Sequence, residues 1–323
     1  MINQVERLNK EGVKLFLNGK FEDAKNKYME ALEINPSFPA TLNNIGMCFL
    51  QEQDFIKAET YFNNAINEKE SDSYLLNLGH ALANQGCFEK AEKKYKKSIA
   101  INPTSLMAYK SLGSLYQKQK RFSESIKVWE TVINNYSRDP LFIIELAKDL
   151  IQLSEYYSAL AALYEAEKFE KNRDLTWYYM SLIHFHLKNF GLAEKAIKRS
   201  VGIKPDNQSF RAMLAAIYLG VSDIKNAIKQ WDFILTLDKN NTPIRLDKAV
   251  ALLAFGYKKE ALEIFEFILN QDSSNEKANY YKALTLLEIN KSDKNAINTL
   301  KNISSNESLF SKQASDILMK LNC

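Results

Sequence analysis

The chain has 323 residues, of which 46% are hydrophobic, so it can bury a core and is not intrinsically disordered. Its 43 basic and 39 acidic residues leave a net charge of +4, which argues against the strong field of a nucleic-acid-binding or membrane-surface protein. Only ten glycines and six prolines occur, which favours an all-helical fold, because strands joined by tight turns use both freely.

When the chain is aligned with itself at a spacing of 34 residues, three positions hold similar residues along nearly its whole length. We call these positions columns. The first holds small residues: Ala24, Ala58, Ala91, Ser125, Ala159, Ala193, Ala227 and Ala261, with Ala296 one residue late. The second, also small, lies eight residues into each repeat: Gly12, Gly46, Gly79, Gly113, Ala147, Ser181, Ala215, Ala249 and Ala283. The third is bulky: Tyr28, Phe62, Tyr95, Trp129, Leu163, Ile197, Trp231 and Phe265. Coupled columns of this kind predict a repeat architecture.

These columns resemble the tetratricopeptide repeat, most fully from Leu78-Gly79 to Pro103. The resemblance covers nearly the whole chain and implies an all-α, right-handed superhelical solenoid of about nine antiparallel helix pairs, forming one domain over 1–323. In chain order the predicted repeats are 5–38, 39–71, 72–105, 106–139, 140–173, 174–207, 208–241, 242–275 and 276–306. An amphipathic helix over 307–321, with Leu309 and Phe310 on its apolar side, is expected to cap the C-terminal end, whereas no cap precedes Val5.

The residue types in these columns have a physical reason. Glycine or alanine in the second column lets the two helices of a pair approach closely. Prolines lie at repeat edges: Pro36, Pro103 and Pro205 where a second helix must stop, and Pro39, Pro140 and Pro243 in the first turn of the next helix. Gly19, Gly86 and Gly256 are expected in the turn within a pair, where a positive φ is needed.

No pattern in the sequence predicts an enzyme, a metal site or a cofactor. His184 and His186 are two residues apart on a predicted helix, so they face about 200° apart and cannot share a metal. The three cysteines, Cys48, Cys87 and Cys323, form no paired motif. The basic run Lys90–Lys97 has Glu89 and Glu92 as neighbouring acidic residues and is interpreted as a solvated helix face. A signal peptide and a membrane-spanning segment are not expected, so the cytoplasm is the predicted location.

The resemblance also implies where a partner binds, because in this family the first helices of successive repeats line a concave groove. Matching positions here are polar in the early repeats, aromatic in the sixth and mainly apolar later. The predicted groove residues are Asn43, Asn44, Asn77, His80, Asn84, Lys110, Ser114, Lys148, Tyr178, Tyr179, Phe185 and Tyr281.

Two known groove types can be compared with these residues. Members that bind chaperone tails carry a carboxylate clamp, but of the corresponding residues in the first three repeats only Asn44 matches. The asparagine ladder of O-linked N-acetylglucosamine transferase, which grips a peptide backbone, is matched better, by Asn44 and Asn77. A side-chain amide suits a backbone because it donates and accepts at once. In the next two repeats the equivalent position holds Ser111 and Glu145 instead of asparagine, so only two asparagines, the rungs of the ladder, are expected to bind a peptide backbone.

Three hypotheses for function follow. The first is a non-catalytic adaptor that binds a protein or peptide segment in the groove, without nucleic acid or membrane insertion. The second is a substrate-selecting repeat array of a separate or truncated enzyme, such as a glycosyltransferase. The third is a scaffold that self-associates through its terminal repeats.

Overall fold

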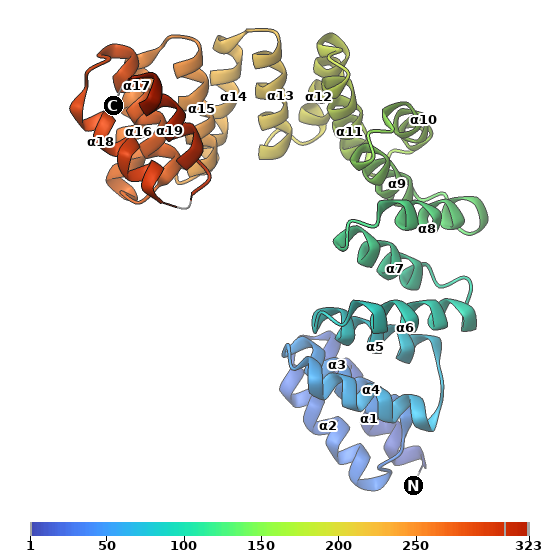
Figure 1. The fold of residues 1–323 in the computed structure, drawn as a ribbon. Helices are drawn as coiled ribbons and strands as arrows, with labels where there is room; N and C mark the ends of the chain where they lie inside the picture. Colours follow the sequence, from blue (N-terminus) through green and yellow to red (C-terminus); the bar gives the residue numbers. More distant parts are fainter. Residues whose placement is uncertain (1, 307, 322–323) are drawn as a thin grey trace. The chain divides into compact units, whose positions relative to one another are not determined.

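The computed structural model describes residues 2–306 and 308–321, and every regular element in them is an α-helix. The chain forms two compact units, Met1–Phe169 and Glu170–Cys323, which are described separately. Unit 1 contains α1 (Ile2–Leu17), α2 (Phe21–Ile34), α3 (Pro39–Gln51), α4 (Phe55–Glu68), α5 (Asp72–Asn84), α6 (Phe88–Ile101), α7 (Leu106–Lys118), α8 (Phe122–Asn135), α9 (Pro140–Gln152) and α10 (Tyr156–Glu167) (Figure 1).

Unit 2 contains α11 (Arg173–His186), α12 (Phe190–Ile203), α13 (Gln208–Gly220), α14 (Ile224–Leu237), α15 (Thr242–Ala254), α16 (Lys258–Gln271), α17 (Glu276–Ile289), α18 (Lys294–Ser305) and α19 (Ser311–Lys320). In both units an odd-numbered helix, the first helix of a pair, packs on the even-numbered helix that follows it, the second helix. The predicted all-α repeat fold is confirmed.

The core of each pair in the first four repeats is an aromatic ring lying on a glycine. Every residue in the alanine and bulky columns is at most 4% exposed. A Cβ atom added to the glycine would lie 2.3 to 2.5 Å from the ring, in the pairs Gly12–Tyr28, Gly46–Phe62, Gly79–Tyr95 and Gly113–Trp129. Since no real Cβ approaches so closely, the missing side chain is what allows the ring to seat on the first helix.

The turn within each of the first eight pairs contains one residue in the left-handed backbone conformation. Gly19, Gly86 and Gly256 supply it with φ of 76°, 79° and 85°, as predicted. In repeats 2, 4, 5, 6 and 7 the same position holds residues with a side chain, at φ of 58° to 63°: Gln53, Lys120, Ser154, Lys188 and Ser222. This conformation costs an L-residue about 1 kcal/mol. These residues adopt it because the packing of the two helices on each other fixes the path of the turn.

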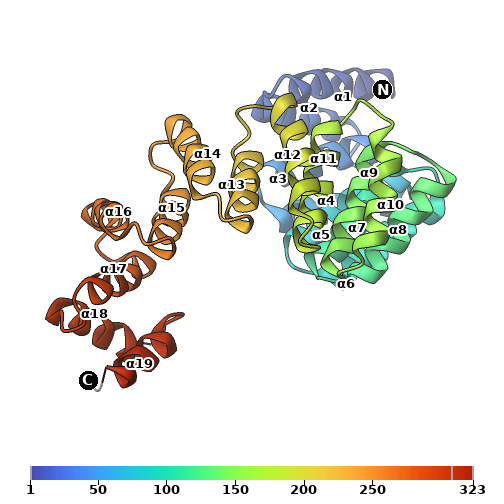
Figure 2. The ribbon, with the colours of Figure 1, turned by 90° about the horizontal axis from the view of Figure 1, so that it is seen from above.

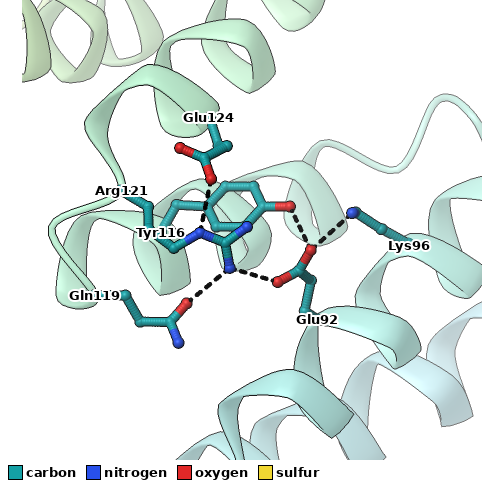
Figure 3. Close-up of polar contacts among 6 residues, drawn as sticks. All are labelled: Glu92, Lys96, Tyr116, Gln119, Arg121 and Glu124. Carbon is teal, nitrogen blue, oxygen red and sulfur yellow. Dashed lines mark hydrogen bonds and ion pairs between the residues drawn. The ribbon is translucent and has the colours of Figure 1, made fainter.

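A charged cluster joins the third repeat to the fourth (Figure 3). Glu92 of α6 accepts hydrogen bonds from Lys96 Nζ at 2.7 Å, from the Tyr116 hydroxyl of α7 at 2.9 Å and from Arg121 Nη1 at 2.7 Å. The Arg121 guanidinium lies 4.4 Å from the centre of the Tyr116 ring and also pairs with Glu124 of α8. Burial alone would raise the pKa of Glu92, but these three hydrogen bonds together lower it to about 2.

In unit 2 an arginine of one helix lies over an aromatic ring of its partner helix in three successive pairs. The distances to the ring centres are 4.0 Å for Arg199 on Trp177, 3.5 Å for Arg211 on Phe233 and 4.3 Å for Arg245 on Phe267. Such cation–π contacts hold the two helices of each pair together at their exposed side.

The two ends of the chain differ from the prediction in detail. The C-terminal cap is confirmed as α19, which packs on α18 at the end of the chain (Figure 2). Its Ala314 and Leu318 are buried in one core with residues of α17 and α18. It begins at Ser311, and Leu309 is 81% exposed rather than part of the apolar side; residue 307 lies outside the described residues. At the other end, a hollow on α1 is lined by polar side chains alone: Gln4, Glu6, Arg7, Lys10, Glu11 and Lys14.

The glycine–ring fit predicts the outcome of a double-mutant cycle. Gly79→Ala is expected to lower the free energy of unfolding by about 1 to 3 kcal/mol, because the new methyl group clashes with the Tyr95 ring. Adding Tyr95→Leu, which imitates the natural pair Ala147 and Leu163, should recover part of that loss. Urea unfolding measures both effects.

Gly202→Ala on α12 is the control for this cycle. A Cβ atom there meets nothing within 4 Å. The substitution should therefore raise the free energy of unfolding by up to about 1 kcal/mol, because alanine has a higher helix propensity than glycine. If the losses of unfolding free energy in Gly79→Ala and in Tyr95→Leu simply add up in the double variant, the proposed fit of ring and glycine is contradicted.

The Glu92 cluster predicts a dependence of stability on pH. The folded-state pKa of Glu92, about 2, lies below its ordinary value of 4.5. Its contribution is therefore fully present above about pH 5 and is lost as the pH falls toward 2. Glu92→Gln should lower the free energy of unfolding by on the order of 2 kcal/mol at pH 7, and the gap to the wild type should narrow below pH 4.

The matched control is Glu194→Gln in unit 2. Glu194 pairs with Lys198 as Glu92 pairs with Lys96, but Asp223 occupies the position of Arg121. Urea unfolding across pH should show a smaller loss for this variant. A loss as large as that of Glu92→Gln would show that the Arg121 contact contributes nothing.

Candidate functional site

The first helices line the inner surface of each unit. In unit 1, α1 contacts α3, α3 contacts α5 and α5 contacts α7; in unit 2, α11 contacts α13 and α15 contacts α17. Within the described residues, second helices of neighbouring repeats do not approach one another as closely. Helices on the inside of a curved stack are the closer ones, so the first helices form the concave side of each unit.

Two of the predicted asparagines, Asn44 and Asn77, each bond to an asparagine of the preceding first helix along this surface. Asn44 Nδ2 on α3 donates to Asn9 Oδ1 on α1 at 2.9 Å, and the Thr41 hydroxyl donates to the same oxygen at 3.0 Å. One repeat further, Asn77 Nδ2 on α5 donates to Asn43 Oδ1 on α3, also at 2.9 Å. These amides therefore connect successive first helices. Each keeps a second N–H, so their role as rungs for a peptide stays a prediction.

The same polar connection continues along α7 and α9. His80 Nε2 on α5 lies 2.8 Å from Ser111 Oγ on α7. Gln117 Nε2 on α7 donates to Glu145 and to Asp149 on α9, at 3.0 and 2.9 Å. Asp149 is 1% exposed and accepts a further hydrogen bond from the Trp129 indole, and its burial raises its pKa. This row of side-chain bonds links α1, α3, α5, α7 and α9.

A concavity of about 270 Å³ opens on the inner surface between α5 and α7. It brings together three predicted residues, His80, Lys110 and Ser114, with others that the prediction omitted. Its full lining is His80, Ala83, Tyr95, Met107, Lys110, Ser111, Ser114, Leu115 and Lys118. We call it the α5–α7 pocket.

The pocket has an apolar floor and a basic rim. Tyr95 and Leu115 are buried, and the His80 ring meets Tyr95 edge-on with centres 5.6 Å apart. Burial lowers the pKa of His80, so this imidazole is neutral at physiological pH. Lys110, Ser114 and Lys118 lie exposed, four residues apart, along one face of α7. The Lys118 ammonium lies 5.2 Å from the centre of the Phe88 ring.

Two other predicted residues of unit 1 lie on the inner helices but outside the pocket. Asn84 Nδ2 donates to the carbonyl of His80 in its own helix. Lys148 on α9 pairs with Glu145 at 2.7 Å. Both polar groups are thus engaged within the protein.

The predicted aromatic residues of unit 2 pack mainly against their own unit. Tyr178 lies 5.1 Å from Tyr179 and 5.2 Å from Phe210 between ring centres, and Phe185 lies 5.7 Å from Phe190. Tyr281 stacks on Phe265 at 6.2 Å and belongs to the C-terminal core. Their rings support the stacking of repeats.

Sequence reasoning missed Met107 and Lys118 as pocket residues. Both occupy inward-facing positions of a first helix, which is the signal that identified Lys110 and Ser114. Among the described residues, no cluster of three or more metal-binding side chains occurs. Over the same residues no helix combines the length and the hydropathy needed to cross a bilayer.

Two segments of the chain, 39–72 and 73–105, match family models of the tetratricopeptide repeat. They correspond to α3–α4 and α5–α6.

Known proteins extend this similarity over most of the chain. BBSome complex member BBS4 from Bos taurus is 24% identical over 281 residues, covering 76% of this chain and 54% of that protein. Protein O-mannosyl-transferase TMTC3 from Homo sapiens is 23% identical over 208 residues, covering 59% of this chain and 23% of that protein. The chain therefore spans about half the length of its BBSome relative.

Among solved structures, the C-terminal part of a TPR repeat-containing protein from Cytophaga hutchinsonii has a TM-score of 0.60 and 18% identity, covering 73% of this chain and 97% of that one. The likeness in structure agrees with the repeat columns and with the two matched segments. The chain is a member of the tetratricopeptide-repeat family.

Proposed function

We propose that the chain is a non-catalytic protein-interaction scaffold that holds a segment of a partner protein against the concave surface of unit 1. The observation that carries this proposal is the α5–α7 pocket, where an apolar floor meets exposed lysines. Sites for protein segments combine such an apolar core with a polar rim. The similarity to a BBSome complex member, a subunit of an assembly by its name, supports a scaffold role.

The row of hydrogen bonds along the inner helices supports this role mechanically. Because Asn44, Asn77 and His80 tie α1, α3, α5 and α7 to one another in succession, this part of the inner surface is held in one arrangement before a partner arrives. A preorganised surface loses less conformational entropy on binding. The second N–H of Asn44 and of Asn77 is then the group proposed to bind a peptide backbone.

A substrate-selecting array of an enzyme is the second candidate, favoured by the similarity to an O-mannosyl-transferase. In that case the bound segment would belong to a protein that an associated enzyme modifies. Self-association through the N-terminal repeat is less favoured, because the hollow on α1 is lined by polar and charged residues. We place the protein in the cytoplasm, where the thiols of Cys48 and Cys87 would stay reduced.

Selection of displayed peptides against the full chain tests the proposal. Peptides enriched on the wild type should bind at least tenfold more weakly to Ser114→Trp, because the indole fills the pocket between Lys110 and Lys118. The control is Ser123→Trp, the same change at an exposed serine of α8, which should bind as the wild type does. Affinities are measured by fluorescence anisotropy.

Two outcomes contradict the proposal. One is that no peptide is enriched. The other is that the enriched peptides bind Ser114→Trp as tightly as the wild type, which would locate binding elsewhere.

A further inference from the structure

We infer that the α5–α7 pocket selects an extended peptide in which an apolar residue has an acidic residue two positions before it and another two positions after it. The inference rests on the proposed function and adds the chemistry of the partner segment. It follows from the size of the pocket, from the charge on its rim and from the spacing of its two lysines.

The pocket has the size and lining for one apolar side chain. Its volume of about 270 Å³ is below the range of about 300 to 1,000 Å³ that small-molecule sites occupy. Ala83, Tyr95 and Leu115 supply apolar contacts. Met107 at the rim is 57% exposed, and its flexible thioether can close over side chains of different shape. An aliphatic or aromatic residue of a peptide is therefore the group that the floor recognises.

The rim carries positive charge that the protein does not neutralise. Within the described residues neither Lys110 nor Lys118 pairs with a carboxylate, and Lys118 faces only the Phe88 ring. Glu145 on the neighbouring α9 is engaged by Lys148 and Gln117. A partner with carboxylates would supply the missing countercharge, and rim charges of this kind set specificity between similar partners.

The spacing of the lysines determines where those carboxylates must lie. Lys110 and Lys118 are eight residues apart on α7, which places their backbones about 12 Å apart along the helix axis. Two acidic groups, one beside each lysine, match that separation without either lysine side chain having to fold toward the other. Four residues of an extended chain span about 13 Å, which matches this separation.

The alternation of an extended chain completes the pattern. Residues two and four positions apart in a strand point to the same side. An acidic residue, an apolar residue two positions later and a second acidic residue two positions later still would all face α7. Ser114 lies midway between the lysines and is small enough to leave the central position open. Acidic residues directly next to the apolar one would point away from the rim.

Three heptapeptides of equal length test this register on the full chain by fluorescence anisotropy. The matching peptide is Ser-Glu-Ser-Leu-Ser-Glu-Ser. Its isomer, Ser-Ser-Glu-Leu-Glu-Ser-Ser, has the same composition and charge, and the third peptide replaces both Glu by Gln. The matching peptide should bind about fivefold to tenfold more tightly than either of the others, since each exposed ion pair contributes modestly. The preference should fade at high salt.

Substitutions in the protein assign this preference to the two lysines. Lys110→Gln with Lys118→Gln should bind all three peptides equally. The control, Lys93→Gln with Lys127→Gln, changes the net charge by the same amount at exposed positions outside the pocket and should keep the preference.

Equal binding of the three peptides to the wild type, with loss of binding in Ser114→Trp, would overturn this inference and leave the proposed function standing. Binding of none of them also overturns it, and the display selection then decides separately on the proposed function. A preference that survives in Lys110→Gln with Lys118→Gln would assign the selectivity to other residues and likewise overturn it.

Discussion

The contact on which this structure depends is the seating of a second-helix ring on the backbone of the first helix. At Gly12, Gly46, Gly79 and Gly113 a Cβ atom would lie within 2.5 Å of that ring, so the interhelical distance is possible only without a side chain. Close approach within each pair brings successive first helices close enough to touch. It thereby creates the inner surface on which the asparagine bonds and the α5–α7 pocket lie.

Much of the fold could be predicted because the columns of small and bulky residues record this contact directly. The prolines at helix ends and three glycine turns were predicted for equally local reasons. The turns at Gln53, Lys120 and Ser154 could not be, because these side chains carry no preference for a positive φ. Leu309 was misassigned because hydrophobicity alone does not reveal whether a neighbouring helix is present to cover a residue.

The site was predicted less completely than the fold. Position along a first helix indicates which side chains face inward, and the structure brings three of the predicted residues, His80, Lys110 and Ser114, into one pocket. It could not show that Asn43 and Asn77 bond to each other or that Tyr281 packs on Phe265. Those contacts depend on the exact offset between neighbouring repeats, whereas sequence spacing gives only the face of each helix.

The central claim, that a partner segment binds in the α5–α7 pocket, is tested most directly by NMR of isotopically labelled methionine methyl groups. Met107 lies on the rim of the pocket, whereas Met29 and Met319 are exposed on α2 and α19. Titration with a bound peptide should shift the Met107 methyl signal and leave the signals of Met29 and Met319 in place. A shift of either of those two with Met107 unchanged would contradict the account.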